Sequence, residues 1–186
     1  MVRILSTSEI RRGKPTRSEY ATLPKLPLSI VCDNFHYAWN VGSIFRVADA
    51  LRIERVYFCG ITAFPPHVEI ERTDGGAYKW VAWERRDSTA DAVSELRERG
   101  VQIVAAELAD GCVRLNHHEW HSPAAIVLGS EVSGVQPCVL RMCDAVVELP
   151  MYGMRNSLNV SSTAAVFAYD FLFRACGGAI PDTVKV

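Results

Sequence analysis

Three segments of this chain carry polar residues at positions where a ligand could bind. They read NVGSIFR at Asn40–Arg46, IVLGSEVSGV at Ile126–Val135 and LPMYGMRNSLNVS at Leu149–Ser161. Together they supply amide, carboxylate, hydroxyl and guanidinium groups, which can hydrogen-bond a polar substrate or hold a charged one. Each segment alone also has a simple structural explanation, so its chemistry depends on where the fold places it.

The first segment comes next after LSIVCD at residues 28–33, an apolar run that predicts a buried strand. Ligands of open α/β sheets bind at the carboxyl ends of strands, which favours this position. Asn40, Ser43 and Arg46 lie three residues apart, and we expect them to form one ridge of a helix that lines a cleft. The simpler interpretation is that Asn40 only caps the helix and Arg46 is a surface cation.

The second and third segments also follow predicted buried strands. Gly129 ends the apolar run AAIVLG and would allow a ligand close to the backbone, and the carboxylate of Glu131 comes two residues later. In the third segment, a loop rich in backbone donors beside an apolar strand end suits an adenine and a ribose. The simpler alternatives are a turn with a surface glutamate and a plain loop.

The elements that would position these segments alternate between strand and helix. Buried strands are expected at residues 28–33, 55–60, 101–107, 124–129 and 145–150, and helices at residues 40–52, 88–99, 137–143 and 159–175. This alternation predicts a parallel α/β sheet covered by helices. Residues 61–87 are harder to interpret, and we expect a helical turn at residues 67–72 and a strand at KWVAWE.

The last predicted helix is apolar around most of its girth. Its wide apolar face consists of Val160, Ala164, Phe167, Phe171 and Leu172, and further alanines extend it. A helix of this kind is buried on more than one side. A dimer interface would cover the second side, and the alternative is a central helix of a monomer.

Length and composition agree with one ordinary globular domain. The chain has 186 residues, of which 49% are hydrophobic and 22% are charged. No apolar run reaches the ~18 residues of a membrane span, and the first residues lack the apolar stretch of a signal peptide. The six cysteines form no CxxC pair and lie mostly in apolar runs, which predicts buried free thiols in a reducing compartment. We therefore expect a cytoplasmic protein.

Residues 1–27 are expected to form an extension before a domain at residues 28–186. Five basic residues and one acid lie in the part up to Arg17, on a chain whose net charge is only −1. A cationic extension on a near-neutral body could bind phosphates. A solvated leader is the alternative, and the sequence leaves both open.

The three segments, in this order and spacing, resemble the signature motifs of the SpoU/TrmH ribose 2′-O-methyltransferases of the SPOUT superfamily. The first motif matches as Asn40-x-Gly42-x-x-x-Arg46 and the second as Gly129-x-Glu131-x-x-Gly134. The third matches as Pro150-Met151-x-Gly153-x-x-x-Ser157-Leu158-Asn159-Val160-Ser161. The resemblance covers roughly residues 28–175, which is nearly the whole expected domain.

The resemblance implies a fold, a cofactor and an assembly. The C-terminal part of the α/β fold would thread through a loop as a deep trefoil knot, a rare exception to unknotted topology. S-adenosylmethionine would bind in the knot, mostly to backbone groups. The residues that map to this role are Ala106, Glu107, Leu128, Gly129, Leu149, Met151, Ser157 and Leu158. The enzyme would be a homodimer in which Asn40 and Arg46 face the partner subunit's cofactor loops.

The implied reaction transfers a methyl group to a ribose 2′-hydroxyl of RNA. The residues implied for catalysis are Arg46, Asn40, Glu131, Ser157 and Asn159. Asn40 and Glu131 would orient Arg46 and the active-site loops, whereas Ser157 and Asn159 would shape the cofactor loop and touch the ribose. The resemblance makes Arg46 the group that activates the hydroxyl.

A guanidinium is a poor general base, because its pKa above ~12 disfavours loss of a proton. Two versions therefore remain open. In one, Arg46 is a base made competent by a nearby substrate phosphate. In the other, Arg46 positions that phosphate and stabilises the developing alkoxide.

Other functions fit the sequence less well. No GxGxxG turn follows the first strand, which argues against a Rossmann enzyme. His117, His118 and His121 match no familiar zinc spacing, so we expect solvated loop histidines and no metal. The side chains of Trp80, Trp83 and Trp120 could stack on bases, but packing is the simpler expectation.

Two alternatives share the expected fold. One is a base-methylating SPOUT enzyme, and the other is an RNA-binding module that has lost catalysis. The intact polar residues of the three motifs argue against both. Because the chain is compact, a tRNA is favoured over rRNA as the substrate.

Overall fold

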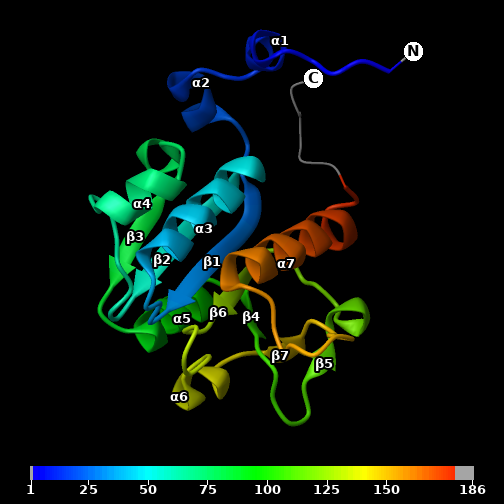
Figure 1. The fold of residues 1–186 in the computed structure, drawn as a ribbon. Helices are drawn as coiled ribbons and strands as arrows, with labels where there is room; N and C mark the ends of the chain where they lie inside the picture. Colours follow the sequence, from blue (N-terminus) through cyan, green and yellow to red (C-terminus); the bar gives the residue numbers. More distant parts are fainter. Residues whose placement is uncertain (1, 179–186) are drawn as a thin grey trace.

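The structure, a computed structural model that describes residues 2–178, is built around a seven-stranded sheet (Figure 1). The strand order is β3-β2-β1-β6-β4-β7-β5, and every neighbouring pair runs parallel. The strands are β1 (Leu26–Asp33), β2 (Ile53–Cys59), β3 (Trp83–Arg86), β4 (Gln102–Ala106), β5 (Val113–Arg114), β6 (Ala124–Leu128) and β7 (Ala145–Glu148). The predicted parallel α/β sheet is confirmed.

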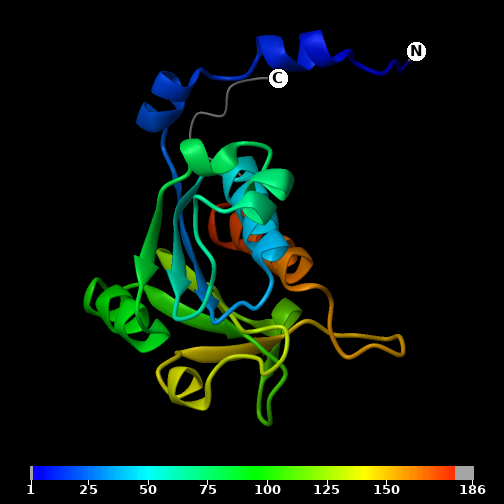
Figure 2. The same ribbon diagram turned by 60° about the vertical axis from the view of Figure 1, so that its left-hand side comes forward.

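Helices cover both faces of this sheet, which explains why its central strands are apolar without alternation. One face carries α3 (Ala38–Ala50), α4 (Val68–Thr73) and α7 (Val160–Ala175), and the other carries α5 (Thr89–Glu98) and α6 (Pro137–Leu140). Figure 2 shows this three-layer arrangement from the side. Short 3-10 helices, η1 (Ala77–Lys79) and η2 (Leu115–His117), lie in the connections.

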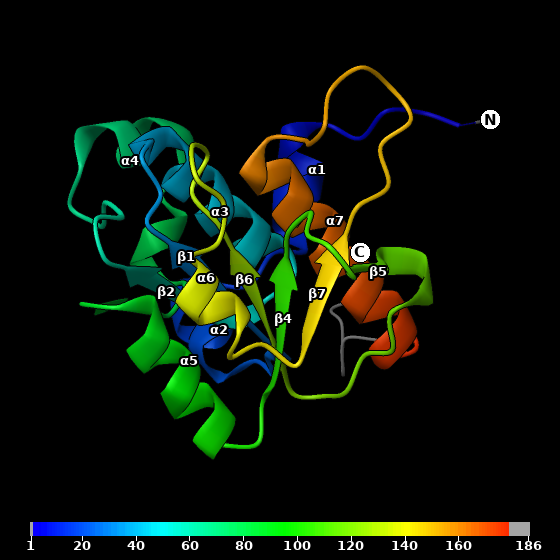
Figure 3. The same cartoon turned by 90° about the horizontal axis from the view of Figure 1, so that it is seen from below.

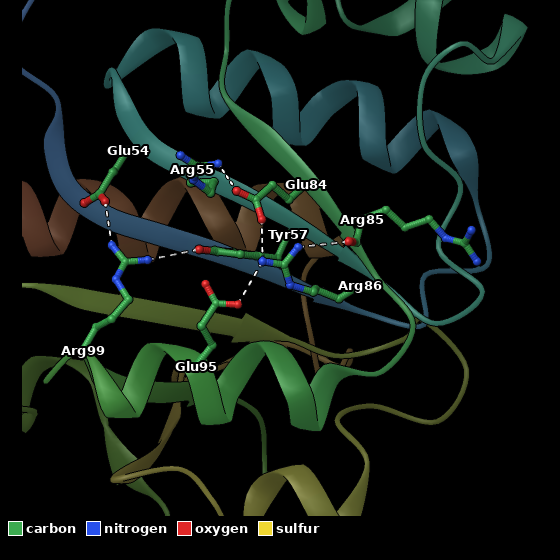
Figure 4. Close-up of polar contacts among 8 residues, drawn as sticks. All are labelled: Glu54, Arg55, Tyr57, Glu84, Arg85, Arg86, Glu95 and Arg99. Atoms are coloured by element: carbon green, nitrogen blue, oxygen red, sulfur yellow. Dashed lines mark hydrogen bonds and ion pairs between the residues drawn. The ribbon is translucent and has the colours of Figure 1, made fainter.

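An ion-pair network ties the edge strand β3 to β2 and α5 (Figure 4). The guanidinium of Arg86 contacts Glu84 at 2.5 Å and Glu95 at 2.9 Å, and Arg55 also pairs with Glu84. Arg99, which ends α5, reaches Glu54 of β2 at 3.2 Å. These contacts cross three elements, so they hold β3 and α5 in place on this face of the sheet.

The residues before β1 form two short helices that the sequence did not lead us to expect. These are α1 (Thr7–Arg12) and α2 (Arg17–Thr22), and each begins with a capping box, at Ser6 and at Thr16. Helix α1 buries no residue, and α2 buries only Tyr20. Both lie to one side of the sheet, as Figures 1 and 2 show. The last residues of the expected domain, 179–186, lie outside the described residues.

Helix α3 begins two residues earlier than expected, and this changes the role of Asn40. Its N-cap is Tyr37, which makes no side-chain cap hydrogen bond, and Asn40 is buried within the first turn. The expectation that Asn40 caps this helix is therefore wrong. The expected cap of α5 is confirmed, because the hydroxyl of Ser88 accepts from the backbone N–H of Asp91 at 3.1 Å.

Helix α7 has one buried side and one exposed apolar side. Ala164, Phe167 and Phe171 are buried against the sheet and α3, whereas Tyr169 and Phe173 are 43% and 60% exposed and stack on one another. Within one chain the helix is therefore buried on one side only. Among the described residues, no helix has both the length and the apolar character needed to cross a membrane.

All six cysteines are free thiols, as expected, but they are not all buried. Cys32 and Cys59 are buried, whereas Cys138 is exposed at the start of α6. Burial raises the pKa of Cys59 to about 12, so this thiol stays protonated at neutral pH.

Candidate active site

Two adjoining cavities lie where β4, β6 and β7 end. The first has a volume of about 430 Å³ and the second about 250 Å³, and both are lined by Ala106, Glu107, Ser157, Leu158 and Thr163. Figure 3 shows that the segments following β6 (yellow) and β7 (orange) leave the same end of the sheet. The combined space suits a small molecule together with part of a larger ligand.

The structure brings together nearly all the site residues that were predicted from the sequence. The eight residues predicted to hold a cofactor all line one or both cavities: Ala106, Glu107, Leu128, Gly129, Leu149, Met151, Ser157 and Leu158. The predicted catalytic residues Asn40, Glu131, Ser157 and Asn159 line the first cavity. Arg46 lines neither.

A chain of hydrogen bonds joins the three polar segments at the wall of the first cavity. The side-chain amide of Asn40 donates to Glu131 Oε1 at 2.5 Å, and its oxygen accepts from Asn159 Nδ2 at 3.0 Å. Glu131 Oε2 also accepts from the backbone N–H of His36 at 2.9 Å. Asn159 in turn caps α7, because its Oδ1 accepts from the backbone N–H of Ser161 at 2.9 Å. Residues 91 and 119 positions apart thereby fix one another's orientation.

Both Asn40 contacts lie within one chain. The expectation that Asn40 faces the partner subunit's cofactor loops stays a prediction. An amide suits this position because it donates to a carboxylate on one side and accepts from a second amide on the other.

The glycines of the second segment allow a tight loop after β6. A Cβ at Gly129 would lie 2.2 Å from the backbone carbonyl carbon of Gly134, and Ser130 and Gly134 pair through two backbone hydrogen bonds. Gly134 has a φ of +68° and lies directly against Glu107, whose carboxylate accepts from the backbone N–H of Val135 at 2.8 Å. Glu107 thus holds this loop as well as lining the cavities.

The third segment projects from the body as an open loop (orange in Figure 2). Tyr152 and Met154 are almost fully exposed, and Ser157 and Leu158 are also exposed where they line both cavities. Within the part of the chain that the structure describes, no backbone N–H from residue 151 to residue 158 donates to another backbone group. These donors are thus available to a ligand.

The lining of the second cavity could hold a purine nucleoside that carries a positive charge. Leu149, Met151 and Phe167 offer apolar surface for a purine, and the unpaired backbone groups of the loop offer donors and acceptors for its edge. The carboxylates of Glu107 and Glu148 also line this cavity, where they can attract a cationic sulfonium.

Arg46 lies on the exposed side of α3, away from both cavities. Among residues 2–178 it has no hydrogen-bond or ion-pair partner. The expected ridge of Asn40, Ser43 and Arg46 is therefore not formed at the site. Each step of three residues turns a helix by 300°, so two steps place Arg46 about 120° away from Asn40 around the helix axis.

Gly42 has a packing role. A Cβ there would lie 2.0 Å from Thr73 Oγ1 and 2.7 Å from the carbonyl oxygen of Ile70. The glycine thus lets α4 lie directly against α3. Thr73 in turn donates its hydroxyl to the carbonyl of Trp39, close to the start of α3.

One of the three histidines, His118, belongs to a packing contact and lines neither cavity. His118 is buried against Trp120, with ring centroids 4.6 Å apart, so the expectation of a solvated histidine is wrong for this residue. Burial, with a contribution from the nearby Arg174, lowers the pKa of His118. Arg174 of α7 donates to the carbonyl of His118 at 2.7 Å, and Trp120 donates to Asp170 at 2.7 Å. Among the described residues, no three His, Cys, Asp or Glu side chains could jointly hold a metal ion.

Trp80, Trp83 and Trp120 pack against the core, as expected. Two other aromatic residues at the first cavity, Tyr37 and Trp39, were missed. They stack with ring centroids 4.5 Å apart and planes 11° apart. Their position just before Asn40 was the signal that could have drawn attention to them.

Asp33 was also missed, although it positions the chain that follows the second segment. Its buried carboxylate at the end of β1 accepts from Thr89 Oγ1 at 2.5 Å, from the backbone N–H of Gln136 at 2.8 Å and from Asn34 Nδ2 at 2.9 Å. These contacts anchor the return of the second segment toward α6.

A family model described as the SpoU rRNA Methylase family matches residues 27–169. A tRNA (guanosine(18)-2′-O)-methyltransferase from Aquifex aeolicus is 31% identical over 143 residues, which make up 77% of this chain and 67% of that protein. The residues that the family model matches include all three polar segments.

Solved structures share the fold over most of the chain. The structure of the A. aeolicus TrmH/SpoU tRNA modifying enzyme aligns with a TM-score of 0.77 and 27% identity, covering 92% of this chain and 84% of that one. An AdoMet-bound rRNA methyltransferase from Sinorhizobium meliloti aligns with a TM-score of 0.74 and 26% identity, covering 86% of this chain and 60% of that one.

Proposed function

The chain belongs to the SpoU rRNA Methylase family, and from this premise we propose that it transfers a methyl group from S-adenosylmethionine to a ribose 2′-hydroxyl of tRNA. The observation that carries the proposal is the hydrogen-bonded chain Glu131–Asn40–Asn159, which joins the three motifs at one cavity. The tRNA assignment is supported by the name of the A. aeolicus relative, a tRNA (guanosine(18)-2′-O)-methyltransferase. That name also makes guanosine 18 the first nucleotide to examine.

The cofactor is assigned to the second cavity and the adjoining floor of the first. Leu149 and Met151 would hold the adenine, and the backbone of Gly129, Ser157 and Leu158 would bind its edge and the ribose. When bound, S-adenosylmethionine supplies a methyl group that is already activated by a sulfonium. The protein's remaining tasks are to align the acceptor hydroxyl and to help remove its proton.

The side chains of the first cavity would receive the target ribose. Asn159 and Ser157 border the space next to the proposed cofactor, and Glu131 holds the Asn40 amide in one orientation. Arg46 would act on the RNA, either as a base beside a phosphate or as the group that positions the phosphate and stabilises the developing alkoxide. Because its side chain is outside both cavities of its own chain, Arg46 is assigned to the site of a partner subunit.

The proposed enzyme is a homodimer. The exposed apolar side of α7, with Val166, Tyr169 and Phe173, would be buried against a second copy. This would also place an exposed Arg46 near the partner's cavities, since α3 packs beside α7. Sedimentation velocity of the full chain tests the dimer.

Further assignments concern the topology, the division of the chain and the compartment. The C-terminal segment after β7 is proposed to thread as a deep trefoil knot, which an experimental structure would trace directly. The domain from residue 28 onward is proposed to carry catalysis, whereas the extension before it, with exposed Arg11, Arg12 and Lys14, would contact the tRNA backbone. The free thiols suit a reducing compartment such as the cytoplasm.

Methyl transfer to unfractionated tRNA from cells that lack the gene tests the function. With S-adenosylmethionine labelled at its methyl group, the label should appear as a 2′-O-methylnucleoside after complete digestion of the tRNA. A DNA version of the labelled region should stay unlabelled, because it has no 2′-hydroxyl. A base-methylated nucleoside would instead support the base-methylating alternative. No heat of S-adenosylmethionine binding in calorimetry would support a non-catalytic RNA-binding module.

A further inference from the structure

The stacked rings of Tyr37 and Trp39 stand at the mouth of the first cavity and have no other evident task. Both line the cavity, yet they are 42% and 45% exposed, so the protein leaves much of their ring surface uncovered. Tyrosine and tryptophan are enriched at binding interfaces, because their rings combine a large apolar surface with a polar group.

Hydrogen bonds fix the backbone that carries the two rings. The carbonyl of Trp39 accepts from Ser43 Oγ and from Thr73 Oγ1, both at 3.1 Å, and the carbonyl of Tyr37 accepts from the backbone N–H of Asn40 at 3.0 Å. They flank Ala38, which is buried. The pair is thus a preformed surface at the start of α3, next to the Asn40 amide that faces the cavity.

We propose that Tyr37 and Trp39 form the platform on which the base of the methylated nucleotide, or its immediate neighbour, stacks when the target ribose enters the first cavity. This inference rests on the proposed function. A ribose hydroxyl reaches a concave site only if its nucleotide leaves the regular stack of the RNA. Single-stranded RNA bases that are splayed out in this way are commonly received by aromatic side chains.

The geometry favours an RNA base over the adenine of the cofactor. Tyr37 and Trp39 line the first cavity only, whereas Leu149, Met151 and Phe167, which suit an adenine, line only the second. A platform beside Asn40 therefore lies on the acceptor side of the site. Stacking is tolerant of base identity, so the pair would contribute affinity and position without reading a sequence.

Binding and turnover of ring-removing and ring-keeping variants test the proposal. Trp39→Ala and Tyr37→Ala remove a ring, whereas Trp39→Phe and Tyr37→Phe keep one. Phe64→Ala is the matched control, because Phe64 is 37% exposed but lines neither cavity. For each variant, filter binding of radiolabelled unfractionated tRNA, calorimetry with S-adenosylmethionine, and kcat and KM for tRNA are measured. Thermal unfolding verifies that each variant is folded.

We expect Trp39→Ala to weaken tRNA binding and raise KM by about tenfold, with the phenylalanine variant within about threefold of wild type. S-adenosylmethionine affinity and the Phe64→Ala variant should be unchanged. The proposal is overturned if both alanine variants bind tRNA like wild type, or if Phe64→Ala loses as much tRNA affinity as they do. It is also overturned if the alanine variants lose S-adenosylmethionine affinity together with tRNA affinity.

The binding arm separates this proposal from the proposed function. Ring-dependent tRNA binding by a wild-type protein that methylates nothing would support the platform and contradict the methyltransferase assignment. Normal methylation of tRNA that does not depend on either ring would support the methyltransferase assignment and contradict the platform. A wild-type protein that neither binds nor methylates tRNA would overturn both.

Discussion

The amide of Asn40 is useful to the site because its two ends differ. It donates a hydrogen bond to the carboxylate of Glu131 and accepts one from the amide of Asn159. A carboxylate in its place would accept at both ends and would face another carboxylate. The arrangement is thus sensitive to a change of a single atom.

Asn40→Asp should therefore destabilise the protein. The new carboxylate would face that of Glu131 with no donor between them, which should lower the free energy of unfolding by about 1–3 kcal/mol and reduce turnover. Denaturant unfolding and methyl transfer at pH 8 measure this. The double variant Asn40→Asp/Glu131→Gln should recover part of the loss, because the glutamine amide can donate to the new carboxylate. An Asn40→Asp protein with wild-type stability at pH 8 would contradict this account.

Arg46 should matter for turnover and not for cofactor binding. Since its side chain lines neither cavity, Arg46→Ala is expected to leave S-adenosylmethionine affinity unchanged in calorimetry. Methyl transfer to tRNA should fall at least about 100-fold, because both versions of the mechanism require the guanidinium. Arg72→Ala, which removes an exposed cation from the neighbouring α4, serves as the control for general loss of positive charge. Near wild-type turnover of the Arg46 variant would refute both versions.

At the scale of elements, the position of α3 depends on how closely α4 approaches it. Gly42→Ala should lower the free energy of unfolding by about 1–3 kcal/mol, because the new methyl group would overlap Thr73 Oγ1 and the carbonyl of Ile70. Adding Thr73→Ala should restore only part of the lost free energy of unfolding, since the backbone carbonyl of Ile70 remains. Gly13→Ala has open space around it and should leave the melting temperature unchanged. Equal melting temperatures for the Gly42 and Gly13 variants would show that the α3–α4 contact is not tight.

Most of the sheet and its helices could be predicted because their signals are local. The buried strands are short apolar runs, and α5 has both its capping Ser88 and its apolar stripe in one continuous segment. Strand β5 was missed because Val113–Arg114 has two exposed residues and pairs with β7 more than thirty positions away. Helix α1 was missed because it buries nothing and so has no apolar periodicity.

In the candidate site too, local features could be predicted from the sequence and contacts between distant residues could not. The motifs identified the cavity-lining residues, because spacing along the chain carries that information. Spacing could not show that Asn40 would bond to Glu131 rather than cap α3, since that choice depends on a contact between residues 91 positions apart. Nor could it show that Arg46 turns away from the cavities, which follows from where α3 begins and which side of it the sheet covers.

The C-terminal half of α7 is held by a contact that should respond to pH. Burial and the nearby Arg174 disfavour the charged form of His118, so its pKa lies below the usual 6.5, although Asp170 and Glu119 oppose this and His121 adds to it. An unfolded chain therefore takes up the proton more readily than the folded one. Stability should be greatest above ~pH 6.5 and fall as the pH drops below that value.

His118→Gln should reduce this pH dependence, because glutamine does not titrate. Melting temperatures of wild type and variant across pH 5 to pH 8 measure the difference. His117→Gln is the matched control, since His117 is exposed beside it and should keep the wild-type slope. Identical slopes for all three proteins would show that His118 does not link protonation to folding.

At the scale of the whole molecule, one predicted site residue lies outside the cavities of its own chain. The cavities hold every predicted site residue except Arg46, which lies exposed on α3, and the adjacent α7 exposes Tyr169 and Phe173. A second copy placed on α7 would cover this apolar surface and could deliver Arg46 to the first copy's cavity. Cavity and cation would then come from different chains.

Complementation between two inactive variants tests this division of labour. Arg46→Ala and Asn159→Ala are co-expressed with different tags, and the mixed dimer is purified through both tags. If Arg46 acts across the interface, one site of the mixed dimer combines an intact cavity with the partner's intact Arg46, while the other site carries both defects. The mixed dimer should then show about half of wild-type activity, although each variant dimer alone is inactive.

The mixed dimer should stay inactive if Arg46 acts within its own chain. If Arg46 acts within its own chain, both sites of the mixed dimer carry one defect and activity stays at the level of the single variants. Calorimetry with S-adenosylmethionine on each purified dimer verifies that the cofactor side is folded, so that a lack of recovery cannot come from a collapsed cavity. Absence of recovery in a dimer that binds the cofactor would therefore place Arg46 with its own chain's site and require α3 to move.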